Sequence, residues 1–225
     1  MQVLITGANR GIGAALAAKA QMLGHQVIGT RREFENSQDI NDWVGLETNW
    51  LQLDVTSPES VQNFAKSLQG RPLDMLICNA GVYPDKGVDT GDITAEMFGT
   101  AFQVNTIGVW ETIQAARPNL RASKGKIAII SSKMGASTNA SGGSYAYRAS
   151  KAATTNLACN LAADLKPAGI AVGSYHPGWV RTNMGGDGAD ISLDECVNGL
   201  WDRFAKLSLE TTGLFENHIG EPQPF

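Results

Sequence analysis

The sequence predicts an α/β fold, a doubly wound parallel sheet of about seven strands with helices on both faces. Short, continuously apolar segments alternate along the chain with segments of helical pattern, which is typical of a parallel sheet buried on both faces. The 225 residues are enough for one well-buried domain. Because no repeat or linker-like tract interrupts the pattern, we expect residues 1–225 to form a single domain.

The first half of the chain supplies the first expected strands, each an apolar run that ends near a turn or polar residue. They are VLIT (3–6), QVIGT (26–30), LQLDV (51–55) and MLICNA (75–80). An alanine-rich helix from about 12 to 23 follows the first strand and ends at Gly24. After the third strand, Ser57 caps a helix that has Pro58 at its first position, where proline is tolerated.

The second half continues the alternation. Its expected strands are KIAIISS (126–132), IAVGSYHP (170–177) and GLFEN (213–217), and long helical patterns cover about 94–117 and 145–166. Ser192 and Glu195 form an S-x-x-E capping box that opens a last helix, which extends to about 207. In such a sheet the crossovers are right-handed, and ligands bind beyond the carboxyl ends of the strands.

The bulk composition excludes several classes of function. The net charge of −4 argues against a nucleic-acid or other polyanion binder. The purely apolar runs are short, so we expect no membrane span. The chain starts with a strand pattern instead of a signal-peptide pattern, and its three cysteines are widely spaced, so we expect reduced thiols and a cytoplasmic protein. Three scattered histidines without a nearby acid cluster predict no metal site.

The segment TGANRGIG, residues 6–13, lies between the first expected strand and the first helix. Glycines at this junction permit a tight turn, and they bring a pyrophosphate close to the N–H groups of a helix N-terminus. The spacing, G-x-x-x-G-x-G, departs from the common G-x-G-x-x-G fingerprint. We expect nucleotide binding here, through Gly7, Asn9, Arg10, Gly11, Ile12 and Gly13.

The second strand ends in GTRR, and this ending predicts which dinucleotide is preferred. An acid at this point holds the ribose 2′-hydroxyl of NAD, whereas guanidinium groups pair with the 2′-phosphate of NADP. Arg31 and Arg32 stand here, and the first acid is Glu33. With Arg10 in the glycine turn, they predict that NADP(H) is favoured over NAD(H).

Two more strand ends carry candidate cofactor contacts. Asp54 and Val55 end the third strand, at the height of an adenine that lies across the sheet. The carboxylate either accepts a hydrogen bond from the adenine amino group or caps the helix that follows, and the spacing leaves both alternatives open. The fourth strand ends in Asn79, Ala80 and Gly81, whose small residues allow a ligand to approach the backbone.

The stretch SYAYRASKAA, residues 144–153, contains two tyrosines and one lysine. Residues four apart share a helix face, so Lys151 is the neighbour of Tyr147, whereas Tyr145 is six positions away and points elsewhere. An ammonium beside a phenol favours the phenolate and lowers its pKa, which suits proton transfer near neutral pH. Taken alone, the pair is better explained by simple helix packing, because Tyr-x-x-x-Lys pairs are common by chance.

Seven motifs follow one another in a fixed order along the chain: TGANRGIG, Asp54, NAG (79–81), VNTIG around Asn105, ISS (130–132), YRASK (147–151) and HPGWVRT (176–182). Together they resemble the short-chain dehydrogenase/reductase family over essentially the whole chain, which implies a Rossmann fold. The stretches SGGSYAYRASKAA, HPGWVRTNMGG and GLFENHIGEPQPF look most like the small carbonyl-reductase-like members labelled C-factor or sniffer.

The resemblance implies a role for each matching residue. Tyr147 is implied as the proton donor or acceptor, and Lys151 as the group that lowers its pKa and binds the nicotinamide ribose. Ser132 polarises the substrate carbonyl, and Asn105 supports a water-mediated proton relay to the lysine. The residues implied against the nicotinamide are Pro177, Gly178, Val180 and Thr182. The implied reaction is NADP(H)-dependent reduction of an aldehyde or ketone to an alcohol.

The chain departs from the family pattern at two points. The family serine usually stands 13 residues before the tyrosine, whereas Ser132 stands 15 before Tyr147 and 13 before Tyr145. An insertion within the glycine-rich stretch MGASTNASGG explains this, and we choose Tyr147 because its spacing to Lys151 lies within one rigid helix. Cys78 replaces a common asparagine, and we expect it to be a buried strand residue.

Two alternatives remain open. One is an NADP(H)-binding sensor or signalling protein of C-factor type, in which turnover is incidental. The other is a sugar-nucleotide epimerase or dehydratase with the same Tyr/Lys pair, although such chains are usually longer. The short segment NMGGDGADIS after Thr182 is the substrate lid in the family, and its length predicts an open site for varied small carbonyl compounds. The family also implies a homodimer or homotetramer through helices 94–117 and 145–166.

Overall fold

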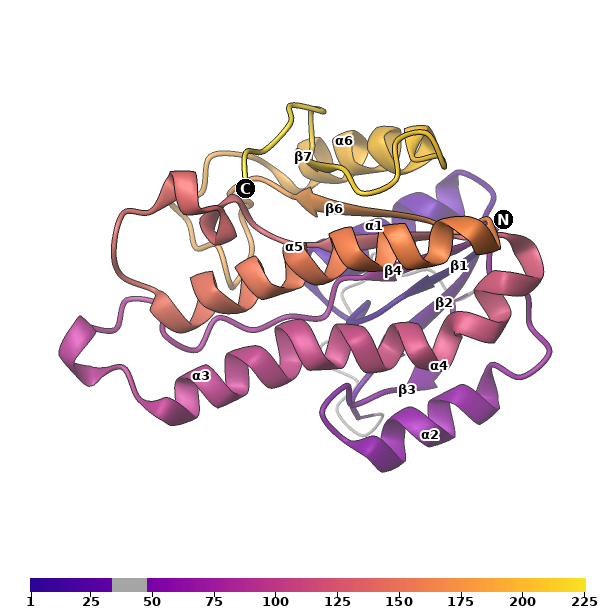
Figure 1. Ribbon diagram of the computed structural model, residues 1–225, viewed down its shortest axis with the longest axis horizontal. Coiled ribbons are helices and arrows are strands. Elements are labelled where there is room, and N and C mark those ends of the chain that lie inside the picture. Colours follow the sequence, from indigo (N-terminus) through magenta and orange to yellow (C-terminus); the bar gives the residue numbers. More distant parts are fainter. Residues whose placement is uncertain (34–47) are drawn as a thin grey trace.

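The computed structural model describes residues 1–33 and 48–225, and its strands form one sheet (Figure 1). They are β1 (Gln2–Ile5), β2 (Gln26–Arg31), β3 (Asn49–Gln52), β4 (Met75–Cys78), β5 (Lys126–Ile130), β6 (Ala171–His176) and β7 (Phe215–Asn217). All seven are parallel, in the order β3-β2-β1-β4-β5-β6-β7. This confirms the predicted fold class. That residues 1–225 form a single domain stays a prediction.

Helices cover both faces of this sheet, as Figure 1 shows. One face carries α1 (Gly11–Met22) and α6 (Leu193–Lys206), and the other carries α2 (Pro58–Ser67), α4 (Gly108–Ser123) and α5 (Tyr145–Leu165). A further helix, α3 (Ala95–Phe102), packs beside α5. The predicted caps are present, because Ser57 Oγ accepts from Ser60 N at 3.2 Å and Ser192 Oγ accepts from Glu195 N at 3.1 Å.

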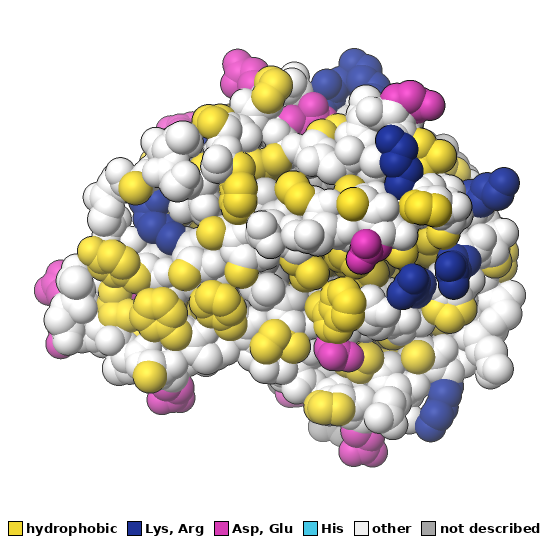
Figure 2. Space-filling model, in the orientation of Figure 1, with side chains coloured by type: hydrophobic (Ala, Val, Ile, Leu, Met, Phe, Trp, Pro, Cys, Tyr) yellow, Lys and Arg dark blue, Asp and Glu magenta, His cyan; other side chains and the backbone are white. Residues whose placement is uncertain are grey.

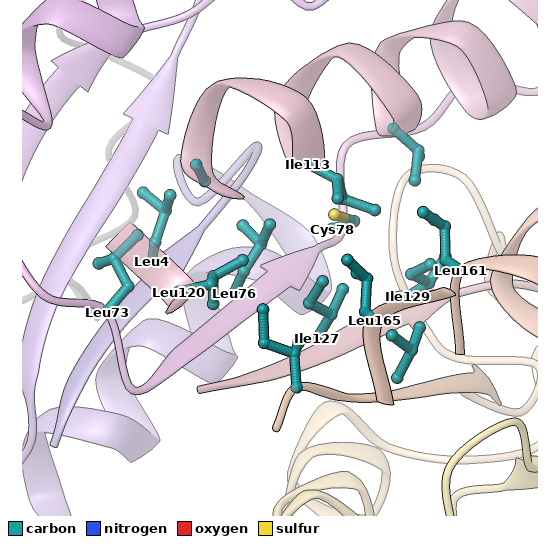
Figure 3. Packing of buried hydrophobic residues seen from close by; sticks show 14 of the residues in the cluster. Leu4, Leu73, Leu76, Cys78, Ile113, Leu120, Ile127, Ile129, Leu161 and Leu165 are labelled. Atoms are coloured by element: carbon teal, nitrogen blue, oxygen red, sulfur yellow. The ribbon is translucent and has the colours of Figure 1, made fainter. Parts of the chain in front are cut away.

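The core on the second face is built from apolar side chains of the central strands (Figure 3). The strands contribute Leu76 and Cys78 from β4 and Ile127 and Ile129 from β5. These side chains point toward the helices, where they meet Ile113 and Leu120 of α4 and Leu161 and Leu165 of α5. Every residue of β4 is buried, which explains why its sequence is continuously apolar. The prediction for Cys78 is confirmed, and burial raises the pKa of its thiol to about 12.

The helix predicted over 94–117 is longer than expected and is interrupted. After α3 comes a π-helical turn, η3 (Gln103–Ile107), and α4 then continues through Pro118 to Ser123. A π turn inserts an extra residue into the hydrogen-bond ladder and is frequent at functional sites. Asn105 lies in this turn and is completely buried. The apolar periodicity of the sequence could not predict this π turn, because the turn depends on the contacts of a polar side chain, that of Asn105.

The strands predicted over 51–55, 75–80 and 126–132 run past their observed ends at Gln52, Cys78 and Ile130. One backbone ladder bond continues after β3 and after β5, from Leu53 N to the Arg31 carbonyl and from Ser131 N to the Tyr175 carbonyl. Near the ends of β3 and β4, backbone N–H groups then bond to side chains. Asp54 N donates to Ser60 Oγ at 2.9 Å, and Asn79 N donates to Thr6 Oγ1 at 3.0 Å. The residues that follow the observed strands therefore lie at the carboxyl ends of the strands, where ligands bind in this fold.

The face formed by α3, α4 and α5 exposes hydrophobic side chains, which gather over α3 and α4 in Figure 2. On this face Ile107 and Trp110 are 42% and 40% exposed. The expected homodimer or homotetramer stays a prediction. Among the described residues, no helix is both long enough and apolar enough to cross a bilayer.

We predict that Leu76→Ala lowers the free energy of unfolding by about 2–5 kcal/mol, because the side chain is fully buried at the centre of the sheet. Urea denaturation followed by circular dichroism measures the change. Met22→Ala is the control, since Met22 is 80% exposed, and its effect is expected to stay within about 0.5 kcal/mol. Equal effects in the two variants would contradict the central position of Leu76.

Candidate active site

The glycine turn between β1 and α1 has a geometry that only glycine allows at two positions. Gly7 adopts a φ of 62°, in the left-handed region. A methyl group on Gly13 would lie 2.2 Å from the Gly7 carbonyl oxygen and 2.4 Å from Asn79 Nδ2. The start of α1 therefore packs directly against the turn and against the end of β4.

Side chains that directly follow β1 and β4 hold the glycine turn in place. Asn79 Nδ2 donates to the carbonyls of Thr6 and Gly7, at 2.9 and 3.1 Å. Thr6 Oγ1 accepts from the backbone N–H groups of Asn79 and Ala80, each at 3.0 Å. Asn79 thus shapes the glycine turn, and Ala80 lies against Gly7, where a methyl group would be 3.2 Å from Ala80 Cα.

The N-terminus of α1 has the properties of an anion site. Arg10 is its N-cap residue and makes no side-chain capping bond, and the first turn contains no acidic side chain. The leading N–H groups of a helix lack partners within the helix, and its dipole favours negative charge there. Together with the close approach that the glycines allow, this donor set fits the pyrophosphate of a dinucleotide.

The end of β2 carries the arginines that the sequence assigns to a 2′-phosphate. The Arg31 guanidinium lies over the Trp50 ring, with Cζ 5.3 Å from the ring centroid. Arg32 is exposed, and its carbonyl accepts from Gln52 Nε2 at 2.9 Å. Arg10 is exposed as well. Arg32 and Arg10 thus have side chains in solvent, whereas Arg31 is packed against an aromatic ring.

Asp54 caps the turn that leads into α2. Its Oδ1 accepts from Thr56 N at 2.9 Å and from Thr56 Oγ1 at 2.7 Å. Val55 beside it packs on the start of α4, where a methyl group on Gly108 would lie 2.7 Å from Val55 Cγ2. Asp54 Oδ1 therefore closes the turn before α2 but does not cap the helix, whose N-cap residue is Ser57, and the adenine contact stays a prediction.

The two tyrosines of SYAYRASKAA have different surroundings in α5. Tyr147 is 8% exposed, and Ser132 lies near enough to its phenol to lower the pKa of that group. Tyr145, the first residue of the helix, is 43% exposed. Lys151 Nζ lies 5.8 Å from the centroid of the Tyr147 ring. The geometry therefore brings Tyr147, Ser132 and Lys151 together and leaves Tyr145 outside.

The loop between Ser132 and α5 explains the unusual spacing of 15 residues. The guanidinium of Arg148, the residue after Tyr147, donates to the carbonyls of Gly143, Met134 and Asn139 and to Ser141 Oγ. One side chain thus holds both ends of the extended loop, so the extra residues do not displace Tyr147.

The preceding serine, Ser131, has a different environment from Ser132. Ser131 Oγ bonds to Thr155 Oγ1 at 2.7 Å and donates to the Lys151 carbonyl at 3.2 Å. These contacts attach β5 to α5, so Ser131 has a structural role. Ser132 Oγ accepts from Met134 N at 3.2 Å, which leaves its own proton available to Tyr147 or to a substrate.

Lys151 and Asn105 meet at Gly81. A methyl group on Gly81 would lie 3.2 Å from Asn105 Oδ1 and 3.6 Å from Lys151 Nζ. Lys151 Nζ donates to the Ile130 carbonyl at 2.8 Å. Asn105 accepts from Val82 N at 2.8 Å through Oδ1, and it donates to Val82 O and to Ser150 Oγ, each at 2.9 Å, through Nδ2. Asn105 is thus firmly fixed, and its proton relay stays a prediction.

Burial controls the protonation of this group. It lowers the pKa of Lys151 to about 8. Burial also raises the pKa of Tyr147 to about 12, the hydrogen bond with Ser132 opposes that increase, and the neighbouring Tyr83 adds to it. The pKa of Tyr147 is therefore raised instead of lowered, because desolvation is the dominant effect on its phenol.

The segment after β6 closes the other side of the site. Pro177 and Gly178 follow the strand directly, and Gly178 adopts a φ of 91°. Val180 is buried and bridges to Ile191. Thr182 lies next to the glycine turn, because a methyl group on Gly11 would be 3.7 Å from Thr182 Cγ2. Of the predicted nicotinamide-side residues, Thr182 therefore lies against the glycine turn.

Three site residues were missed by sequence reasoning: Tyr83, Asp85 and Lys86. The ring of Tyr83 stacks on that of Tyr147, with centroids 4.0 Å apart and planes at 17°. Asp85 accepts from backbone N–H groups of α5, and Lys86 donates to the carbonyls of Met184 and Gly185, in the segment predicted as the lid. Their partners lie 61 to 99 residues away in the chain, so no local pattern signals them.

No three histidine, cysteine, aspartate or glutamate side chains gather into a metal-binding group within residues 1–33 and 48–225. The chemistry of the described site is instead that of a phenol, a hydroxyl and an ammonium beside an anion-binding turn.

Comparison with known proteins agrees with this arrangement. Residues 1–190 match the family model described as short chain dehydrogenase. A protein from Rhodococcus sp. (strain AD45), 1-hydroxy-2-glutathionyl-2-methyl-3-butene dehydrogenase, is 32% identical over 226 residues, which cover 97% of this chain and 96% of that one. C-signal from Myxococcus xanthus is 34% identical over 164 residues, which cover 72% of this chain and 98% of that one.

Solved structures with the same architecture include two carbonyl reductases. The NADPH bound carbonyl reductase from chicken fatty liver has a TM-score of 0.91 and 30% sequence identity, and the match covers 100% of this chain and 98% of that chain. Carbonyl reductase Sniffer of D. melanogaster has a TM-score of 0.90 and 28% identity, and the match covers 100% of this chain and 99% of that chain.

We predict that Lys151→Met makes the protein more stable near neutral pH. A pKa lowered from 10.5 to about 8 means that the buried ammonium costs about 3 kcal/mol there. Loss of the charge-assisted bond to the Ile130 carbonyl offsets about 1.5–3 kcal/mol of this cost, so the net gain is at most about 1.5 kcal/mol. Between about pH 8 and pH 10.5 the unfolded chain binds the proton more tightly, so wild-type stability rises with pH and the gain shrinks.

Chemical denaturation at a series of pH values measures this difference. Lys66→Met is the control, because Lys66 is exposed on α2, and its effect is expected to stay within about 0.5 kcal/mol at each pH. A Lys151→Met variant that is less stable than wild type at pH 7 would show that the ammonium is not desolvated.

Proposed function

The chain belongs to the short-chain dehydrogenase family, and from that premise we propose that it is an NADP(H)-dependent reductase of aldehydes or ketones. It is thus an oxidoreductase that uses a nicotinamide cofactor. The observation that carries the finer proposal is the buried cluster of Tyr147, Ser132 and Lys151, beside a glycine turn that fits a pyrophosphate.

In the proposed reaction NADPH, when bound, supplies the hydride that reduces the carbonyl carbon. Ser132 donates a hydrogen bond to the carbonyl oxygen, on which negative charge develops. Tyr147 transfers its phenolic proton to that oxygen as general acid. Lys151, charged at neutral pH, stabilises the phenolate that remains, and Asn105 holds the backbone beside it at Val82.

The protonation of Tyr147 supports reduction as the favoured direction. With a pKa of about 12, the phenol carries its proton at neutral pH and is ready to act as an acid. Oxidation of an alcohol requires the phenolate as base, and burial disfavours that form before the reaction starts. The resting protonation of Tyr147 thus suits the reductive half of a reversible reaction.

The proposed cofactor contacts lie at the carboxyl ends of the strands. Gly7, Gly11 and Gly13 shape the pyrophosphate site, and Arg32 together with Arg10 pairs with a 2′-phosphate. Solved structures of similar fold that are described with NADPH or NADP bound support this preference. On the nicotinamide side we assign Pro177, Gly178, Val180 and Thr182, of which Thr182 lies beside Gly11 of the glycine turn.

One observation favours the alternative of an NADP(H)-binding signalling protein with incidental turnover. The relative named C-signal matches over 72% of this chain. Against it stands the retention of Tyr147, Ser132 and Lys151 in one buried cluster. Tight NADPH binding with no turnover across a panel of aldehydes, ketones and quinones would favour the alternative.

We predict that Tyr147→Phe lowers kcat/KM for carbonyl reduction by about 100- to 10,000-fold, because the ring and its packing on Tyr83 remain while the transferable proton is lost. NADPH oxidation followed at 340 nm with an aldehyde substrate measures it. Tyr145→Phe is the matched control two residues away and is expected to keep wild-type activity. A fully active Tyr147→Phe would refute the mechanism.

We predict that Arg32→Ala weakens NADPH binding by about 10- to 100-fold and leaves NADH binding unchanged, because the lost contact is a charge-assisted bond to the 2′-phosphate. Fluorescence titration gives both dissociation constants. Arg121→Ala serves as control, because it removes the same charge from an exposed position in the last turn of α4. Tighter binding of NADH than of NADPH by the wild type would overturn the cofactor preference.

A further inference from the structure

The segment after β4, residues 82–86, lies across the N-terminal end of α5. Its first residue, Val82, is fixed by both functional atoms of the Asn105 side chain. Tyr83 stacks on the Tyr147 ring, and its hydroxyl is hydrogen-bonded to Ser144 Oγ. This short stretch of chain therefore contacts the site at several points, although the proposed reaction gives none of its residues a role.

The start of α5 lacks a local cap. Ser144, the N-cap residue, has a left-handed backbone with a φ of 52°, and its side chain makes no capping hydrogen bond. The first turn contains no acidic residue of its own. A helix start without such partners leaves N–H groups unsatisfied and tends to fray.

Asp85 supplies the missing cap from a distant part of the chain. Its Oδ2 accepts from Ala146 N at 2.7 Å, and its Oδ1 accepts from Tyr147 N at 3.2 Å. The carboxylate is completely buried. Both of its oxygens are thus committed to α5, and one of them holds the backbone of the proposed catalytic tyrosine itself.

This contact matters for chemistry because Tyr147 is only the third residue of α5. The end of a helix moves more easily than its middle, and a displacement of about 1 Å of a reacting group costs on the order of 100-fold in rate. The Tyr83 ring fixes one face of the phenol, and Asp85 fixes the backbone from which the phenol projects.

We infer that Asp85 is a positioning residue of the reaction, which holds Tyr147 at the substrate by capping α5 from the loop after β4. The inference rests on the proposed function. The next residue, Lys86, contacts a different part of the site, since its Nζ donates to the carbonyls of Met184 and Gly185 in the lid, at 2.7 and 3.2 Å. Neighbouring residues of one loop thus hold the catalytic helix and the substrate lid.

The test compares Asp85→Ala, Asp85→Asn and Lys86→Met in the full chain. Both Asp85 variants are expected to lower kcat, by about 10- to 100-fold for alanine, with NADPH affinity within about twofold of wild type. Asparagine keeps the size of aspartate but turns an NH₂ donor toward one of the two N–H groups, so it also disrupts the cap. Lys86→Met is expected to raise KM for the carbonyl substrate and to leave kcat near wild type.

Two further readouts separate positioning from general loss of structure. With NADPH deuterated at the transferred position, the kinetic isotope effect on kcat is expected to rise in the Asp85 variants, because a misplaced Tyr147 slows the chemical step itself. Amide hydrogen exchange of Ala146 and Tyr147 is expected to accelerate in the same variants. Asp89→Ala is the control, because Asp89 is an exposed residue of the same loop that makes no side-chain capping bond.

The outcomes distinguish the two proposals. Wild-type kcat and isotope effect in Asp85→Asn, or in a folded Asp85→Ala, would overturn the role of Asp85 while the proposed function stands. Loss of kcat in Asp89→Ala as well would also overturn it. Absence of NADPH-dependent turnover in the wild type would overturn the proposed function, and Asp85 would then cap α5 without any role in a reaction.

Discussion

The positions of the reacting side chains depend on how buried backbone groups are hydrogen-bonded where the ladders of β1 and β4 stop. There the Thr6 hydroxyl accepts hydrogen bonds from two backbone N–H groups, and the Asn79 side-chain amide donates hydrogen bonds to two backbone carbonyls. Because buried backbone groups without partners are costly, these four bonds make one unit of the glycine turn and the end of β4. That unit brings Gly81 to Asn105 and Lys151, and it directs residues 82–86 over the start of α5.

The same requirement explains the π turn at Asn105. An extra residue in a helix shifts the ladder, and the carbonyl of Asn105 accepts from Thr154 Oγ1 of α5 at 2.7 Å. Thr106 Oγ1 donates to the Ser150 carbonyl on the same helix, at 3.0 Å. The irregular segment is therefore stabilised by α5, and α5 is held in turn by Asp85. In both places, a side chain from another element makes the hydrogen bonds that hold the irregular backbone.

Sequence reasoning could predict the parts that local pattern encodes. Apolar runs predicted the strands and their parallel arrangement, and helical spacing separated Tyr147 from Tyr145. It could not predict the π turn or the contacts of Asp85, whose partners are more than 60 residues away. It also missed the direction of the tyrosine pKa, because spacing reports that a lysine is near but not how strongly both groups are desolvated.

Desolvation of the cluster bears on which function the chain performs. A lysine buried with a pKa near 8 destabilises the folded protein near neutral pH, and a phenol held at a pKa near 12 gives no compensating charge. A module that only bound NADPH would need the glycine turn and the arginines, and it could use the Lys151 ammonium on the nicotinamide ribose. It would have no use for the Tyr147 phenol and the Ser132 hydroxyl beside that ammonium. An ammonium next to a proton-bearing phenol serves a reaction in which negative charge develops beside it, as in carbonyl reduction. The three side chains together, held in one buried cluster, therefore favour catalysis over simple binding.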